Sequence, residues 1–276
     1  MDSAMTRHVI TTARKSCPES IISAKQLALD WQLNFIPRKN QSIAALLSTI
    51  REKWGADLRL YVAGEKRVDI YSNLNEAPFF FHPNAAMFRA KHFVRYGTDP
   101  LVTAAKIQPG DSIVDATLGL GSDAQLLSLA TGESGSVRGL EASVDIARIT
   151  SMGLAFYQND FTQLTDAMRR IQVHACHHTD WLEQQSASSY DVIYFDPMFQ
   201  EMVGKSDGIS TLRRFSYSEA LTSKAVEEAV RVARKRVVLK DHFKSNRFEL
   251  LGFNRIRRKS STVHYGVIEK YGRQGE

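Results

Sequence analysis

Short runs of β-branched and aromatic residues alternate with longer helical segments between residues 112 and 240, and this alternation constrains the fold most strongly. The β-rich runs lie at 112–117, 136–140, 172–178, 191–196 and 236–240. The segments 124–130, 144–157, 161–170 and 217–233 carry apolar residues at spacings of three and four, as amphipathic helices do. Neighbouring parallel strands need crossover connections, which are usually helices. The pattern therefore predicts an α/β fold with a doubly wound, mostly parallel sheet covered by helices on both faces.

The two ends of the chain depart from this alternation. The runs 252–258 and 262–270 are joined by a tight polar link, which predicts an antiparallel pair at one edge of the sheet. Residues 1–79 contain predicted strands at 9–15 and 34–38, helices starting near Pro18 and Ser42, and a hairpin formed by 58–62 and 67–71. We therefore expect a small α/β domain at 1–79 and a main domain at 80–276.

Composition narrows the class of protein. The chain has 276 residues, of which 43% are hydrophobic and 24% are charged, so it can bury a sizeable core and is not a disordered or fibrous protein. It contains no run of eighteen apolar residues and no secretory signal pattern, which predicts a cytoplasmic protein without a membrane segment. Its two cysteines, Cys17 and Cys176, are too few and too far apart for a disulfide scaffold.

The net charge of +6 is unevenly distributed. Residues 1–100 carry a net charge of +5, residues 101–200 carry −7 and residues 201–276 carry +8. Basic ends around an acidic middle indicate that part of the chain performs chemistry while the rest attracts a polyanion such as nucleic acid. The alternative for any single basic run is a solvated surface. The candidate substrate-binding residues on this basis are Arg255, Arg257, Arg258 and Lys259, together with Arg89 and Lys91, which could also hold the carboxylate of a cofactor.

A glycine loop joins the first strand of the predicted sheet to its helix. Gly119 and Gly121 permit a tight turn and a close approach of backbone N–H groups to a ligand, and the helix that begins near Ser122 presents its positive end. Glu141 ends the next strand, twenty residues after Gly121. A carboxylate at that position can accept both ribose hydroxyls of an adenosine-containing cofactor.

Two cofactors are compatible with this loop. The spacing Gly119-x-Gly121-x-x-Ala124 formally satisfies the NAD fingerprint with alanine in the last position. Asp115, however, lies just before the glycines, where its carboxylate would repel a pyrophosphate. The same carboxylate suits a ligand that carries an ammonium and a sulfonium. The loop therefore favours S-adenosylmethionine.

A second turn follows the fourth β-rich run. In the segment Asp196-Pro197-Met198-Phe199, the Asp196 carboxylate and the Pro197 carbonyl can accept hydrogen bonds from both N–H groups of an exocyclic amine on a planar base. The ring of Phe199 can stack on the same base. Asp-Pro alone is a common turn signal. In combination with the glycine loop and Glu141, the segment predicts the catalytic residues Asp196, Pro197 and Phe199.

Three motifs together resemble class I S-adenosylmethionine-dependent methyltransferases, and in particular the bacterial family that methylates the N2 amine of a guanine in small-subunit ribosomal RNA. These motifs are Asp115-Ala-Thr-x-Gly-Leu-Gly-x-Asp123, Asp196-Pro-Met-Phe199 and Val237-Val-Leu-Lys240. The resemblance implies a seven-stranded Rossmann-like sheet and, as partner, ribosomal RNA or the small-subunit particle. It also implies cofactor contacts from Asp115, Thr117, Gly119, Gly121, Ser122, Asp123 and Glu141, an adenine contact from Asp180, and a substrate contact from Lys205. One departure is Gln200, where the family is expected to have proline.

The segment His174-x-Cys176-His177-His178 invites a metal interpretation. Alternation along a strand would put His174, Cys176 and His178 on one face, but the sequence offers no second ligand cluster, so we predict no metal site. Two other functions remain open on sequence alone. The same fold could methylate a protein carboxylate or a small molecule, or the chain could be a non-catalytic RNA-binding module, for which Asp115 and Glu141 would serve no purpose.

Overall fold

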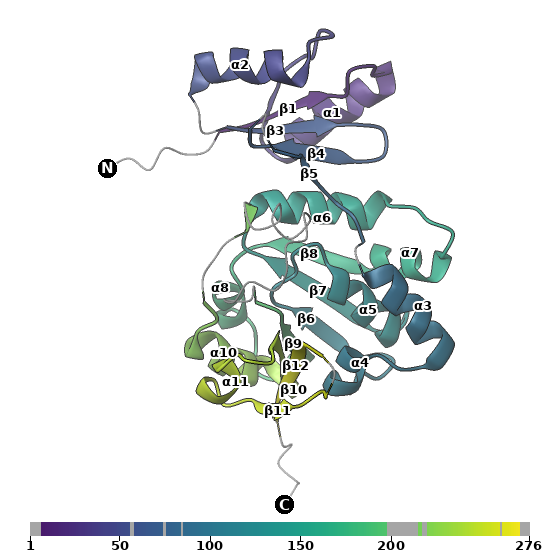
Figure 1. Ribbon diagram of the computed structural model, residues 1–276, viewed down its shortest axis with the longest axis vertical. Coiled ribbons are helices and arrows are strands. Elements are labelled where there is room, and N and C mark those ends of the chain that lie inside the picture. The colour runs from purple at the N-terminus through teal and green to yellow at the C-terminus, as the bar shows by residue number, and fades with distance from the viewer. Residues whose placement is uncertain are drawn as a thin grey trace, which may run out of the picture. The chain divides into compact units, whose positions relative to one another are not determined.

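The computed structural model describes residues 7–55, 58–73, 76–83, 85–197, 215–216, 220–259 and 261–270. The chain divides into two compact units, Met1–Phe81 and His82–Glu276. Figure 1 shows a mixed sheet with helices in each of them.

The first unit is built on a five-stranded sheet in the order β2-β1-β3-β4-β5. Its strands are β1 (Arg7–Thr12), β2 (Asn34–Phe35), β3 (Leu58–Ala63), β4 (Val68–Tyr71) and β5 (Phe79–Phe80), of which β2, β1 and β3 run parallel. Its helices are α1 (Pro18–Asp30) and α2 (Ile43–Trp54). The Ser42 side chain caps α2 by accepting a hydrogen bond from the Ala45 N–H at 3.0 Å, as the sequence predicted. Leu46, Leu47 and Ile50 of α2 pack on the apolar face of the sheet.

The second unit contains a seven-stranded sheet in the order β11-β12-β10-β9-β6-β7-β8. The parallel strands are β6 (Ser112–Asp115), β7 (Ser136–Glu141), β8 (Ile171–Ala175), β9 (Tyr190–Phe195) and β10 (Ala233–His242). The antiparallel edge predicted from the sequence is formed by β12 (Val263–Glu269) and β11 (Asn254–Ile256). The number of strands, their order and the antiparallel edge agree with the sheet that the sequence resemblance implies.

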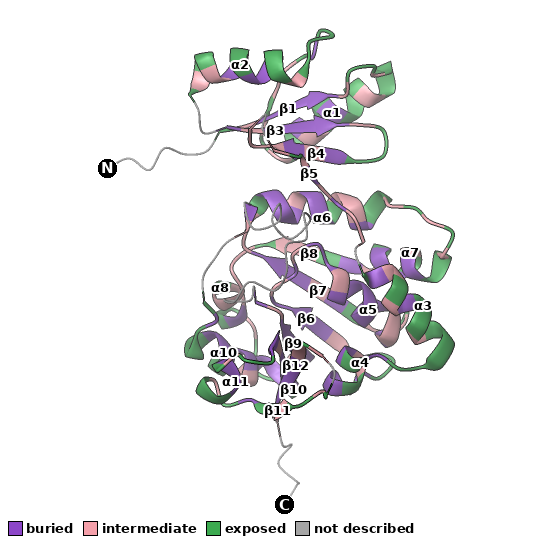
Figure 2. Cartoon of the chain, viewed as in Figure 1, coloured by how far each residue is buried: buried purple, intermediate pink, exposed green. Residues whose placement is uncertain are grey.

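Helices cover both faces of this sheet. The helices α3 (Ala86–Tyr96), α5 (Ser122–Thr131) and α7 (Thr162–Arg169) pack together, with α4 (Pro100–Ala105) and α6 (Val144–Phe156) beside them (Figure 1). The helices α8 (His178–Glu183) and α10 (Ser223–Val232) pack together elsewhere, and α11 (Arg247–Leu250) precedes β11. Figure 2 shows that the central strands are mostly buried, because helices cover both faces of the sheet.

The order of the strands creates one special position. From β6 the chain moves outward through β7 and β8, then returns to the other side of β6 with β9 and continues outward with β10. The connections that leave β6 and β9 at their carboxyl ends therefore diverge. Ligands of open α/β sheets bind at such a switch point, outside the carboxyl ends of the strands.

The predicted strand at 172–178 is too long. β8 ends at Ala175, where the Cys176 N–H makes the last hydrogen bond of the ladder to the Glu141 carbonyl at 3.0 Å, because His177 then caps α8 by accepting from the Thr179 N–H at 3.3 Å. The expected strand alternation of His174, Cys176 and His178 is therefore wrong.

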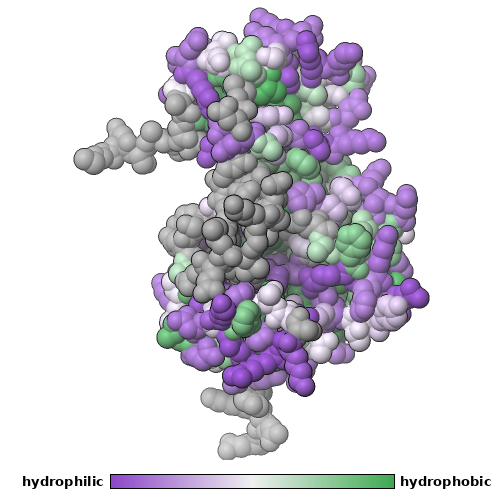
Figure 3. All heavy atoms as spheres, viewed as in Figure 1, coloured by the Kyte–Doolittle hydropathy of each residue, from purple (hydrophilic) through white to green (hydrophobic). Residues whose placement is uncertain are grey.

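None of the described helices is both long and apolar enough to cross a bilayer. On the face shown in Figure 3, hydrophobic residues of the described chain are interspersed with hydrophilic ones.

Candidate active site

The carboxyl ends of β6 and β9 meet at the switch point of the sheet. Asp115 is the last residue of β6 and pairs with Tyr194 of β9. Beyond this pair, the Ala116 N–H donates to the Tyr194 carbonyl at 2.8 Å, and the Leu118 N–H donates to the Leu140 carbonyl at 2.9 Å. The loop that leaves β6 is thus held to the strands on both of its sides.

The glycine loop adopts a conformation that favours glycine. Gly119 has φ +53° and Gly121 has φ +71°, both in the left-handed region, and Gly121 directly precedes α5. A Cβ built on Gly119 would meet no atom within 4 Å, so the loop faces open space at this residue. The Thr150 hydroxyl donates to the Gly119 carbonyl at 2.7 Å and fixes the loop from α6.

Glu141 closes the loop from the end of β7. Its Oε2 atom accepts a hydrogen bond from the Gly119 N–H at 2.9 Å, and its Oε1 atom accepts one from the Ser143 N–H at 2.8 Å. Burial raises the pKa of this carboxyl group, and the two N–H donors oppose the rise. Each carboxylate oxygen can accept a second hydrogen bond. Glu141 can therefore hold the loop and still accept ribose hydroxyls.

Asp115 is a buried carboxylate, with 1% of its surface exposed. Its Oδ1 atom accepts the Thr117 N–H at 3.2 Å. Burial raises its pKa well above the usual value, and the neighbouring carboxylate of Asp123 adds to the rise. A ligand that brings positive charge would stabilise the ionised form, which is what the ammonium and sulfonium of S-adenosylmethionine supply. The open glycine loop, Glu141 and Asp115 therefore fit this cofactor.

Asp123 lies beneath the loop, at the centre of a network of charged side chains. Lys240 Nζ donates to its Oδ2 atom at 2.8 Å, the Tyr194 hydroxyl donates to the same atom at 2.7 Å, and Arg89 forms an ion pair with Oδ1. Burial opposes ionisation of Asp123, but Lys240 and Arg89 outweigh it and hold its pKa below its usual range. Arg89 also forms a two-bonded pair with Asp99, at 3.0 and 2.9 Å. The structure thus shows Asp123 and Arg89 bound to each other, and their contacts with cofactor or substrate stay predictions.

Asp196 follows β9 at the switch point. Its backbone N–H donates to the Thr117 hydroxyl at 2.6 Å, and its Oδ2 atom accepts from Lys240 Nζ at 2.6 Å. Its side chain is 27% exposed, while Pro197 is buried. Burial raises the pKa of Asp196 to about 6; the Lys240 ammonium opposes this rise and the Asp123 carboxylate adds to it. The site therefore presents a carboxylate that titrates just below neutral pH.

Sequence reasoning missed two members of this site. In the sequence, Lys240 is the last residue of a motif and Tyr194 lies within a predicted strand, and in the structure both contact Asp123. A polar residue at the end of an apolar strand was the available signal for Lys240, because parallel strands bring such residues to one edge. Nothing in the sequence singled out Tyr194.

The remaining predicted residues lie in several places. Asp180 is exposed in the first turn of α8, on the carboxyl side of β8, and Lys91 is exposed on α3. Phe199 and Lys205 lie outside the described residues. Arg255 lies in β11, and the residues Arg257, Arg258 and Lys259 follow it in the link to β12. In the described part of the chain, no three His, Cys, Asp or Glu side chains are grouped so as to hold a metal ion.

Comparison with known proteins agrees with this geometry. Residues 55–250 match a family described as "Putative SAM-dependent methyltransferase". The chain is 43% identical over 261 residues to the "uncharacterized protein YpiP" of Bacillus subtilis, covering 95% of this chain and 99% of the relative. It is 27% identical to the ribosomal RNA small subunit methyltransferase J of Pseudoalteromonas atlantica, covering 84% of this chain and 87% of the relative.

A solved structure shares the fold. The SAM-dependent methyltransferase NGO1261 of Neisseria gonorrhoeae superimposes with a TM-score of 0.60 at 16% identity, and the match covers 95% of this chain and 96% of that one. The matched family, with which the residues at the switch point agree, identifies this chain as a member of the S-adenosylmethionine-dependent methyltransferases, an enzyme that uses S-adenosylmethionine as its methyl donor.

Proposed function

We propose that this enzyme transfers a methyl group to the exocyclic N2 amine of a guanine in ribosomal RNA, as a cytoplasmic protein acting on small-subunit RNA or the small-subunit particle. The observation that carries the proposal is the placement of Asp196. Its carboxylate lies at the switch point next to the cofactor loop, one oxygen is held by Lys240, and the side chain remains partly exposed.

The reaction needs alignment more than a strong base. Bound S-adenosylmethionine supplies an electrophilic methyl group, and transfer forms a nitrogen–carbon bond as the sulfur–carbon bond breaks. Asp196 and the Pro197 carbonyl accept hydrogen bonds from the two N–H groups of the amine. This directs the lone pair of the amine nitrogen toward the methyl group. After transfer the nitrogen carries an extra proton, which Asp196 can accept, since its pKa is about 6. A stacking role for Phe199 is part of the proposal.

Two lines of support favour RNA. One relative of this chain is named as a ribosomal RNA small subunit methyltransferase, and it aligns over 84% of the chain. Residues 201–276, which include the basic run, carry a net charge of +8 and can neutralise phosphates. A protein carboxylate as methyl acceptor, by contrast, has no N–H group that could donate a hydrogen bond to Asp196.

The test is mass spectrometry of ribosomal RNA nucleosides from cells with and without the protein. We expect N2-methylguanosine to fall in the deletion strain and to return with the wild-type gene, but not with Asp196→Asn. Calorimetry on the purified Asp196→Asn variant serves as control and should show S-adenosylmethionine affinity within a few-fold of wild type. An unchanged nucleoside profile, with transfer instead to protein or to small molecules, would refute the RNA substrate.

A further inference from the structure

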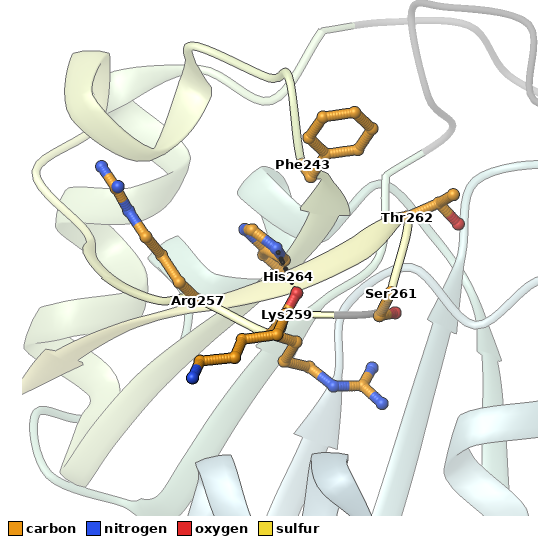
Figure 4. Close-up of a pocket in the computed structure, with 7 residues that line it drawn as sticks. Phe243, Arg257, Lys259, Ser261, Thr262 and His264 are labelled. Atoms are coloured by element: carbon orange, nitrogen blue, oxygen red, sulfur yellow. Dashed lines mark hydrogen bonds between the residues drawn. The ribbon is translucent and has the colours of Figure 1, made fainter.

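A shallow basic pocket lies in the second unit, outside the site described above. It encloses about 510 Å³ and is lined by Phe243, Arg257, Arg258, Lys259, Ser261, Thr262 and His264. In Figure 4, His264 lies in the middle of this group, with Phe243 on one side of it and Lys259 on the other. No acidic residue is part of this lining.

The pocket opens on the same edge of the sheet as Asp196. β12 runs antiparallel to β10, so it begins where β10 ends, and His242 pairs with Val263. The Phe243 N–H extends this ladder by donating to the Thr262 carbonyl at 2.9 Å. Lys240, which contacts Asp196, is three residues before Phe243, or about 10 Å along a strand. The pocket therefore lies just beyond the carboxyl end of β10, near the end of the sheet at which Asp196 lies.

The backbone around the pocket is held in place by its own hydrogen bonds. The His264 side chain, 8% exposed, donates from Nε2 to the Arg258 carbonyl at 3.2 Å. The Ser261 hydroxyl accepts from the Val263 N–H at 3.2 Å. His264 Nδ1 is buried and has no hydrogen-bond partner among the described residues. The pocket is thus formed before a ligand binds.

Two cationic side chains that line the pocket are free to bind a ligand. Arg257 and Lys259 are exposed and make no hydrogen bond or ion pair within the described ranges, and the Phe243 ring is 39% exposed beside them. Arg255, two residues earlier, differs: its guanidinium donates to the Ser245 carbonyl at 2.6 Å and lies over the Phe248 ring at 4.5 Å. Arg258 resembles Arg255, since its Nη1 atom donates to the Val263 carbonyl at 3.5 Å. The basic run therefore divides into two residues whose guanidinium groups contact the protein, Arg255 and Arg258, and two that face solvent and are unpaired within the described chain, Arg257 and Lys259.

We propose that this pocket binds one nucleotide of the RNA substrate next to the guanine that is methylated, with its phosphate held by Arg257 and Lys259 and its base stacked on Phe243. The proposal rests on the proposed function and extends it to a second contact with the RNA chain. Cations alone would suit any anion. An exposed aromatic ring beside free cations is the combination with which proteins bind single-stranded nucleic acid, because every base has a face that can stack.

The experiment measures the affinity of the full-length protein for a fluorescein-labelled, guanine-containing single-stranded oligoribonucleotide at several salt concentrations. Phe243→Ala should weaken binding roughly 5- to 150-fold, the range found for loss of one stacked base. The double variant Arg257→Gln/Lys259→Gln should lower the slope of log K against log salt concentration by about 0.7 for each phosphate that the protein no longer neutralises. The control Lys15→Gln/Lys66→Gln removes two exposed cations from the first unit and should leave the slope unchanged.

The outcomes separate this inference from the proposed function. RNA methylation with unchanged binding by both pocket variants would overturn the nucleotide pocket and leave the function standing. Binding that depends on Phe243 and on salt, without methylation of any RNA, would overturn the function and leave the pocket as an RNA contact. Competition by inorganic phosphate or by polyglutamate as strong as that by unlabelled RNA would also overturn the inference, because it would reveal a general anion site.

Discussion

Replacing Lys240 by methionine tests the electrostatic arrangement around Asp196. The Lys240 ammonium lies 2.6 Å from Asp196 Oδ2 and 2.8 Å from Asp123 Oδ2, so it favours the ionised form of both carboxylates. Methionine has an unbranched side chain that is one atom shorter, and it removes the charge. Asp123 still has Arg89 and the Tyr194 hydroxyl as partners, so we expect the variant to fold.

The structure sets the size of the expected effect. The pKa of Asp196 is about 6 with Lys240 present, so about 90% of Asp196 is ionised at pH 7. Loss of an opposite charge at this distance raises a carboxyl pKa by about 1–3 units, to between roughly 7 and 9. The ionised fraction at pH 7 then falls to between about 50% and 1%, and methyl transfer at this pH should fall by roughly 2- to 100-fold.

The assay is a pH–rate profile of methyl transfer from radiolabelled S-adenosylmethionine to ribosomal RNA lacking the modification. Wild-type activity should rise with pH through an apparent pKa near 6, because the ionised Asp196 accepts the amine N–H bonds. In Lys240→Met the rise should move to higher pH, and activity should recover in alkaline solution. Asp196→Asn, which cannot ionise, should remain inactive across the range.

Protein stability gives a second measurement that does not depend on the substrate. Asp196 has a higher pKa in the folded protein than its usual 3.8, so its contribution to stability is fully present below pH 3.8 and is lost as pH rises through about 6. In Lys240→Met the pKa of Asp196 is expected to be higher, so the free energy of unfolding should continue to fall up to a higher pH. A variant whose rate profile and stability profile have the same midpoints as wild type would refute the role assigned to Lys240.

Three further predictions concern the cofactor loop and the basic run. Glu141→Ala should weaken S-adenosylmethionine binding in calorimetry by about 1.5–3 kcal/mol for each ribose hydrogen bond removed, less what water recovers, and unchanged affinity would contradict its role. Gly121→Ala and Gly119→Ala should each lower the free energy of unfolding by about 1–3 kcal/mol in urea titrations, because both positions have positive φ; equal stability to wild type would show that the loop relaxes. Arg255→Ala should lower the melting temperature, whereas Arg257→Ala should change stability by less than about 0.5 kcal/mol, and equal effects would contradict the division of the basic run.

The order of helices and strands could be predicted from the sequence because it depends on local patterns. The runs that became β6 and β9 have apolar centres, Ile113–Val114 and Val192–Phe195, as expected of strands buried on both faces. The predicted ends of helices and strands were less accurate. β8 stops at Ala175 because the chain turns into α8, which the His177 side chain caps, and no glycine or proline in the sequence marks this turn.

The residues proposed to bind the cofactor could also be recognised from the sequence. Gly119, Gly121 and Glu141 stand at spacings that follow from the connection of a strand, a turn and a helix, and Asp115 ends a strand that the sequence identified. The chemistry of this site is thus encoded in residues close together along the chain.

Only the tertiary structure decided how the charged residues pair. Arg89 and Asp123 are 34 residues apart, and Asp123 and Lys240 are 117 apart, so no spacing rule connects them. The sequence suggested that Arg89 and Asp123 bind ligands, and the structure shows them bound to each other. Long-range ion pairs of this kind form where the topology of the sheet brings strand ends and helices together, because a buried charge requires a partner at the same position in space and not at a given distance in sequence.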